Sequence, residues 1–160
     1  MSMCSGRYLT VQADDLGLAP AFNEGIHDAY QGGILTGVTL RTNGSAFEDA
    51  VFRVIPECPD VSVGIHLNVV EGRSQRSSIS KKSRICSFSG EYTASFASLL
   101  KAHILRESDV FVEIEDDYRH QIETVLHSGI NIDHVSSHQH THAIPSIFEI
   151  VCKLSLVCQE

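Results

Sequence analysis

The 160-residue chain contains no tryptophan, and aromatic residues make up only 7% of it. No apolar run approaches the ~18 residues of a membrane span, so we expect no membrane partner. The five cysteines are widely spread and form no C-x-x-C pair, which argues against a disulfide framework and against a zinc ribbon. The first residues show no basic start followed by an apolar core, so we expect a cytoplasmic protein with reduced thiols.

Basic residues are also scarce, because 12 Lys and Arg face 20 Asp and Glu and give a net charge of −8. This balance argues against a nucleic-acid partner. The composition, 42% hydrophobic and 20% charged, fits one soluble domain over residues 1–160. A closed eight-unit β/α barrel usually needs about 250 residues, so a complete barrel does not fit.

Short apolar segments that suit strands alternate with helical patterns along the chain. The predicted strands are residues 7–13, 36–42, 61–67 and 130–135. The predicted helices begin at Pro20, at the capping box Ser45-x-x-Glu48, at Phe96, at Ser108 and at Pro145. The second of these helices should end before Pro56 and the fourth at Gly129. This alternation predicts an α/β fold with right-handed crossovers and a parallel sheet.

Residues 71–90 interrupt the alternation with a serine-rich stretch that holds five of the 12 basic residues. Loops of this length are either disordered or functional. We therefore expect a flexible loop within the domain, either as a solvated insertion or as a lid over a polar substrate.

Polar clusters follow three of the predicted strands: Asp14-Asp15, His66 with Asn68, and His138-Gln139-His140-Thr141-His142. The carboxyl ends of parallel strands lie on one edge of a sheet, so these clusters should converge. One aspartate and two histidines would supply the three protein ligands of a catalytic divalent metal. Each cluster taken alone also fits turn chemistry, a packed histidine or an incidental histidine-rich loop.

The spacing within two of these clusters suggests how their side chains could bind a metal or accept a proton. Asp14 and Asp15 are neighbours, and successive side chains of a strand point to opposite sides, so one could bind the metal while the other accepts a proton. On extended backbone His138, His140 and His142 would share one face and could converge on one ion.

The motifs in this order resemble those of the YdjC-like carbohydrate deacetylases, the chitooligosaccharide deacetylase family. They are Val11-Gln12-Ala13-Asp14-Asp15-Leu16-Gly17, Asn43-Gly44, Val63-Gly64-Ile65-His66-Leu67-Asn68 with Glu71-Gly72-Arg73, and Ser137-His138-Gln139-His140-Thr141-His142 with Pro145. The resemblance covers nearly the whole chain. It implies a β/α barrel of the polysaccharide deacetylase type, of which this chain would form about half.

The resemblance implies that metal-activated water removes acetyl groups from N-acetylated oligosaccharides. Asp15, His66 and His138 would be the metal ligands, Asp14 the general base, and Asn43, Asn68, His140 and His142 substrate-binding residues. The family is usually assigned Mg²⁺, so the resemblance implies a divalent metal, Mg²⁺. Zn²⁺ is the alternative, because related deacetylases favour it and two imidazoles lean toward a transition metal.

The chain departs from the family pattern in three ways. It has about half of the β/α units, it contains no His-Pro pair of the kind found later in the family, and Ser136 stands where an aspartate is usual. The alternatives are a truncated or inactive metal-binding homologue that acts as an assembly module, and a hydrolase of another amide or ester. An open half-barrel with unpaired edge strands and an uncovered apolar face also predicts a homodimer or a poorly soluble monomer.

Overall fold

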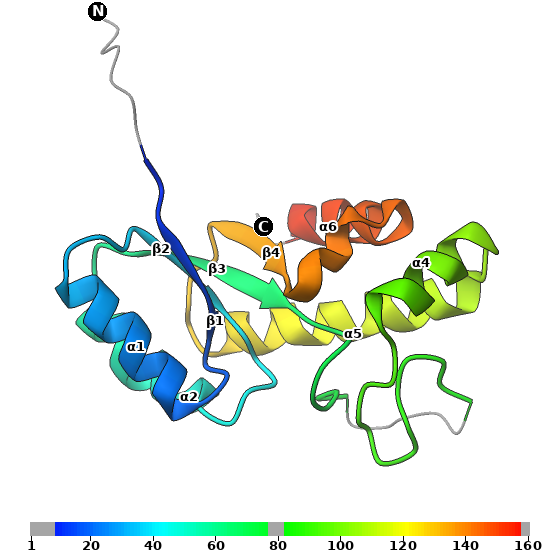
Figure 1. The fold of residues 1–160 in the computed structure, drawn as a ribbon, viewed down its shortest axis with the longest axis horizontal. Helices are drawn as coiled ribbons and strands as arrows, with labels where there is room; N and C mark the ends of the chain where they lie inside the picture. The colour runs from blue at the N-terminus through cyan, green and yellow to red at the C-terminus, as the bar shows by residue number, and fades with distance from the viewer. Residues whose placement is uncertain (1–8, 77–81, 158–160) are drawn as a thin grey trace, which may run out of the picture.

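Four parallel strands form a single sheet in the order β1-β2-β3-β4 (Figure 1). The computed structural model describes residues 9–76 and 82–157. The strands are Gln12–Leu16 (β1), Gly37–Leu40 (β2), Ser62–Leu67 (β3) and His134–Ser137 (β4). The predicted α/β class and the parallel sheet are confirmed.

The first and last strands lie further along the chain than the sequence predicts, and residues 7 and 8 of the first prediction fall outside the described residues. Pairing with the inner strands decides these bounds, because Gln12 pairs with Gly37 and His134 with Gly64. As a result Asp14 and Asp15 belong to β1 itself.

The helices are Pro20–Gln31 (α1), Phe47–Asp49 (α2), Ile55–Glu57 (α3), Phe96–Ile104 (α4), Ser108–His127 (α5) and Pro145–Val157 (α6), with a π-helical turn at Ala50–Val54 and a 3-10 turn at His138–Ala143. Proline begins α1 and α6 as predicted, since its missing N–H costs nothing in a first turn. Gly129, with φ of 78°, follows α5 as predicted.

One predicted helix start, the capping box at Ser45, is wrong. Ser45 does not cap a helix, because its hydroxyl donates to the Leu18 carbonyl, and the helical segment continues through Pro56 by way of the π-helical turn. That wider turn accommodates a proline, which has no N–H for the usual helical bond. The helix predicted to begin at Ser108 is confirmed, with Glu107 rather than Ser108 in the cap position.

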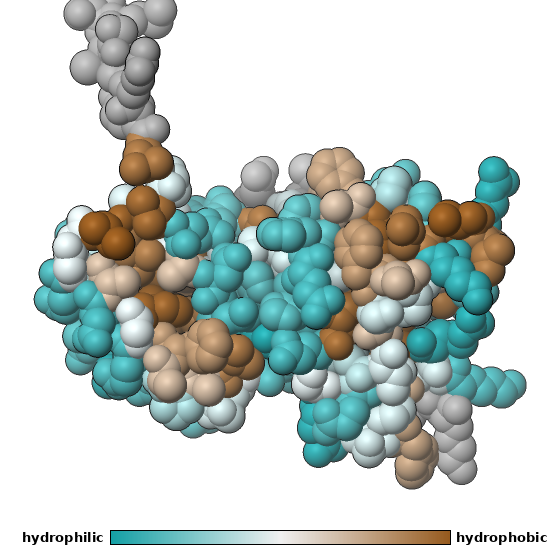
Figure 2. Space-filling view, in the orientation of Figure 1, coloured by the Kyte–Doolittle hydropathy of each residue, from teal (hydrophilic) through white to brown (hydrophobic). Residues whose placement is uncertain are grey.

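Alternation along the strands separates an apolar set of sheet residues from a polar set. Val38, Leu40, Ile65 and Leu67 are buried in one core with residues of α1 and α5. The expected uncovered apolar face is therefore not found in the described part of the sheet. Exposed apolar side chains lie on helices and in connecting segments instead, and Figure 2 shows hydrophobic areas at both ends of the molecule with a hydrophilic band between them.

The connection between β3 and α4, residues 68–95, docks onto α5 on both sides of residues 77–81. Those five residues, in the middle of the predicted flexible loop, lie outside the described residues. On one side Ser74 and Arg76 contact the buried Asp117 of α5, and on the other Tyr92 donates to the same carboxylate. The described flanks of the loop are thus anchored to the core.

Cys58, Cys86 and Cys152 are free thiols, while Cys4 and Cys158 lie outside the described residues. Among the helices of the described residues, none combines the length and the apolar character that crossing a bilayer requires.

Candidate metal centre

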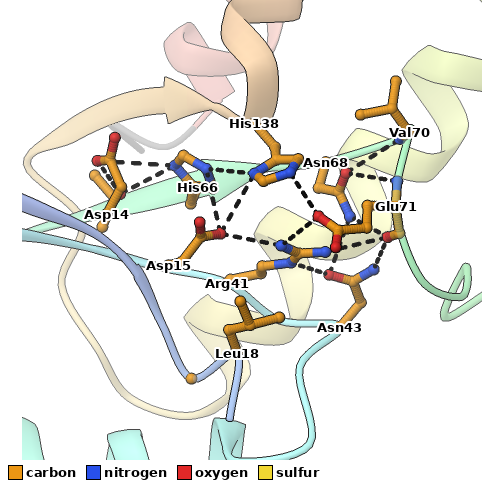
Figure 3. Close-up of polar contacts among 12 residues, drawn as sticks. Asp14, Asp15, Leu18, Arg41, Asn43, His66, Asn68, Val70, Glu71 and His138 are labelled. Atoms are coloured by element: carbon orange, nitrogen blue, oxygen red, sulfur yellow. Dashed lines mark hydrogen bonds and ion pairs between the residues drawn. The ribbon is translucent and has the colours of Figure 1, made fainter. Parts of the chain in front are cut away.

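Asp15, His66 and His138 meet at the carboxyl edge of the sheet, as the strand order predicts (Figure 3). Asp15 Oδ1 lies 3.5 Å from His66 Nε2 and 3.4 Å from His138 Nδ1. The two imidazole nitrogens are 3.3 Å apart. Three potential ligand atoms from three strand ends therefore form a nearly equilateral triangle.

The size of this triangle can be compared with what metal coordination requires. Zinc bonds of about 2.1 Å at tetrahedral angles place neighbouring ligand atoms about 3.4 Å apart. Octahedral Mg²⁺, with similar bond lengths but right angles, would bring them to about 3.0 Å. The observed separations fit a small divalent cation, and within the described residues this is the one such group.

A bulge in β1 brings both aspartates toward His66. Ala13 pairs with Val38 and Leu16 with Leu40, so Asp14 and Asp15 together face one residue of β2. Asp15 adopts a φ of 62°, which a short polar side chain tolerates better than most. Asp14 Oδ1 lies 3.9 Å from His66 Nδ1, so the imidazole sits between the two carboxylates. The expectation that they point to opposite sides of the sheet is therefore wrong.

Asp14 is held through one of its two oxygens. Thr39 and Gln12 donate to its Oδ1 at 2.7 Å and 2.9 Å. Burial alone would raise the pKa of Asp14, but these hydrogen bonds, together with His66 and His140, lower the pKa below its usual value. Its Oδ2 accepts no hydrogen bond from a described residue, so an ionised oxygen stays available.

The surroundings of His66 select one tautomer. Its Nδ1 lies 2.8 Å from the Ser136 hydroxyl and 3.1 Å from the Thr39 hydroxyl, whose proton goes to Asp14. Nδ1 therefore carries the hydrogen, and Nε2 keeps its lone pair toward the triangle. Burial lowers the pKa of His66 despite the nearby aspartates, which favours the neutral ring. Ser136, where the resemblance led us to expect an aspartate, makes this outer contact.

Arg41 and Glu71, for which the sequence predicts no role, complete the site. Arg41 is 1% exposed, and its Nη1 donates to Asp15 Oδ1 at 3.0 Å and to Glu71 Oε2 at 3.3 Å. Glu71 Oε2 lies 2.6 Å from His138 Nε2. One signal could have found Arg41, because it directly follows β2 at the same edge of the sheet.

Asn43 and Asn68, predicted to bind substrate, contact the turn at Glu71. The side-chain amides of both residues donate to the Glu71 carbonyl, at 3.0 Å and 2.6 Å. Their contact with a substrate stays a prediction.

The histidine array does not form the extended segment that the sequence suggested. Residues 138–143 make a 3-10 turn in which Gln139 and His140 have positive φ. The turn separates His140 and His142 from His138. The rings of His140 and His142 lie edge to face with centroids 6.1 Å apart, and neither joins the triangle. His142 also contacts the Ser137 hydroxyl at 2.7 Å.

Comparison with known proteins relates nearly the whole chain to one family. The family model described as YdjC-like protein matches residues 8–158. A carbohydrate deacetylase of Clostridium beijerinckii is 33% identical over 147 residues, which cover 92% of this chain and 56% of the relative. A chitooligosaccharide deacetylase of Salmonella paratyphi B is 30% identical over 151 residues, with 93% and 56% covered. The chain thus spans about half the length of these relatives.

A solved structure from Enterococcus faecalis V583, described as a candidate cellobiose-phosphate cleavage protein, has a similar fold. The TM-score is 0.75 at 22% identity, and the match covers 94% of this chain and 56% of that one. At this identity the likeness concerns the fold alone.

Proposed function

Because the chain belongs to the YdjC-like protein family, we propose its function from what its relatives are named for and from the geometry of the site. Because the curated relatives described above are named carbohydrate or chitooligosaccharide deacetylases, we infer that the chain carries the metal-binding part of a hydrolase that removes acetyl groups from N-acetylated sugars. Its four strands would form about half of a β/α barrel. The observation that carries this proposal is the triangle of Asp15, His66 and His138 beside the ionised Asp14.

Asp15, His66 and His138 would hold the metal. A divalent cation bound there supplies Lewis acidity, which lowers the pKa of water and polarises an acyl carbonyl. Two imidazole nitrogens and one carboxylate oxygen suit a transition metal, and the separations of 3.3–3.5 Å are closer to tetrahedral than to octahedral spacing. The ligand types and their spacing favour Zn²⁺, with Mg²⁺ as the alternative.

The proton chemistry is assigned to Asp14. Its Oδ2 is the acceptor for the proton of the attacking water, while Thr39 and Gln12 fix the carboxylate through Oδ1. Its lowered pKa keeps it ionised at neutral pH, as a base requires. His66 stays neutral and keeps its Nε2 lone pair directed at the triangle, because hydroxyl oxygens accept the hydrogen on its Nδ1.

Acetate release tests the catalytic part of the proposal. The chain is treated with a chelator, supplied again with Zn²⁺ or Mg²⁺, and incubated with N-acetylglucosamine oligomers. We expect acetate from the wild type and from Asp116→Asn, a control at an exposed carboxylate of α5, and none from Asp14→Asn. Metal uptake without acetate from the wild type would instead favour the metal-binding module as the function of this chain.

Metal uptake tests the ligand set separately. His66→Ala and His138→Ala should each abolish stoichiometric binding of the added ion, because two protein ligands hold a divalent cation poorly. His27→Ala, a control on α1 that pairs with Glu57, should bind as the wild type does. Full uptake by either site variant would remove that histidine from the ligand set.

A further inference from the structure

Glu71 contacts the candidate metal centre from outside the triangle of ligand atoms. Its Oε2 lies 2.6 Å from His138 Nε2, the ring nitrogen that faces away from Asp15 and His66 (Figure 3). We propose that Glu71 is a positioning residue that fixes the tautomer and orientation of His138 for metal binding. This inference rests on the metal centre of the proposed function.

The two ring nitrogens of His138 have different neighbours, and this difference selects the tautomer. A carboxylate only accepts hydrogen bonds, so the 2.6 Å contact to Glu71 places the hydrogen on Nε2. The competing acceptors for a hydrogen on Nδ1 are His66 Nε2 at 3.3 Å and Asp15 Oδ1 at 3.4 Å. The shorter contact prevails, and Nδ1 is left with a lone pair pointing into the triangle.

Arg41 keeps the Glu71 side chain in place. The Glu71 side chain is 54% exposed and would otherwise be free to turn into solvent. The guanidinium of Arg41, itself buried, donates to Glu71 Oε2 through Nη1 at 3.3 Å and to the Glu71 carbonyl through Nη2 at 3.2 Å. The same Nη1 donates to Asp15 Oδ1. The buried guanidinium of Arg41 thus links Asp15, a candidate metal ligand, with Glu71.

Two asparagines fix the backbone beneath Glu71. Asn68 accepts from the Glu71 N–H through Oδ1 at 3.2 Å and donates to the Glu71 carbonyl through Nδ2 at 2.6 Å. Asn43 Nδ2 donates to the same carbonyl. Asn68 is anchored in turn by the buried Gln121 of α5, whose side-chain amide bonds both the N–H and the carbonyl of Asn68. The position of Glu71 is therefore set by the core of the fold.

Glu71→Gln tests the inference, because glutamine keeps the size and the backbone contacts and removes the charge. By titration calorimetry of the 160-residue chain with Zn²⁺ and with Mg²⁺, we expect binding about 10- to 100-fold weaker than in the wild type, the usual effect of losing an outer-sphere partner. Glu91→Gln is the matched control, since Glu91 is a half-exposed carboxylate in the same β3–α4 connection that pairs with Arg73. It should bind the ions as the wild type does.

A second readout does not involve metal. In the metal-free chain at pH 8, nitrogen-15 NMR of the histidines should show His138 with its hydrogen on Nε2, and Glu71→Gln should mix the two tautomers. A hydrogen on Nδ1 in the wild type, or unchanged affinity in Glu71→Gln, would overturn the inference while leaving the metal centre in place. A wild type that binds neither ion would overturn the proposed metal centre and this inference together.

Discussion

Replacing Asp117 by asparagine should destabilise the protein, because this buried carboxylate holds the β3–α4 connection against α5. Asp117 is 1% exposed. Its Oδ1 accepts from the Tyr92 hydroxyl at 2.6 Å and from Gln121 Nε2 at 2.9 Å. Its Oδ2 accepts from the Ser74 hydroxyl at 2.7 Å and pairs with Arg76 Nε at 3.0 Å. Four donors therefore converge on one charged group.

Asparagine can satisfy only part of this arrangement. The hydroxyls of Tyr92 and Ser74 can rotate and accept from the new NH₂ group, whereas Gln121 Nε2 and Arg76 Nε can only donate. The best amide orientation keeps oxygen toward Arg76 and loses the bond from Gln121, at a cost of about 1 kcal/mol. Changing the acceptor for Arg76 from a charged to a neutral group costs about 1 kcal/mol more. We expect a total loss of about 2 kcal/mol in the free energy of unfolding.

Urea unfolding followed by circular dichroism measures this loss. With an m value of about 2 kcal/mol/M, the midpoint should fall by about 1 M. Asp116→Asn is the control, because Asp116 is 67% exposed and lies 3.7 Å from Arg76 Nη1, and exposed pairs of this kind contribute about 0–1 kcal/mol. Equal midpoints for Asp117→Asn and Asp116→Asn would refute the assignment of Asp117 as the anchor of the connection.

Two further predictions concern stability. The hydrogen bond from Arg53 lowers the pKa of Asp49 to about 2, whereas an unfolded aspartate titrates near ~3.9. On acidification Asp49 therefore becomes protonated in the unfolded chain at a higher pH than in the folded protein. The stabilisation that Asp49 provides above pH ~4 is lost as the pH falls toward 2. The urea midpoints of wild type and Asp49→Asn should converge over that interval. A constant difference would contradict the reasoning. At Gly25 in α1 a Cβ meets nothing within 4 Å, so Gly25→Ala should raise the free energy of unfolding by about 0.5–1 kcal/mol. At Gly44 a Cβ would clash with the Gly17 carbonyl oxygen, so Gly44→Ala should lower the thermal midpoint. A Gly44→Ala protein that is more stable than Gly25→Ala would contradict both predictions.

Much of the fold follows from local sequence features. Proline at positions 20 and 145 begins helices, and Gly129 follows the end of α5. Hydrophobic alternation predicted where strands and helices occur because it acts over a few neighbouring residues. Bounds were less predictable, since β1 and β4 are defined by the strands with which they pair.

The candidate site also divides into a part that the sequence predicts and a part that depends on long-range packing. That one aspartate and two histidines gather at one edge could be predicted from the sequence, because their clusters end or follow strands and parallel strands bring such positions together. The choice of Asp15, His66 and His138 within these clusters came from the family resemblance. The contact between Glu71 and His138 had no local signal, since it joins residues 67 positions apart and depends on the path of the β3–α4 connection.

The sequence by itself determined the alternation of strands and helices, the edge at which chemistry collects and the residue types that gather there. Only the tertiary structure decided the bulge that turns both aspartates toward His66, the kinked turn that separates His140 from His138, and the outer contact of Glu71. The physical reason is distance along the chain. Patterns among neighbours set local conformation, whereas a hydrogen bond between remote residues exists only after packing has fixed the position of both partners.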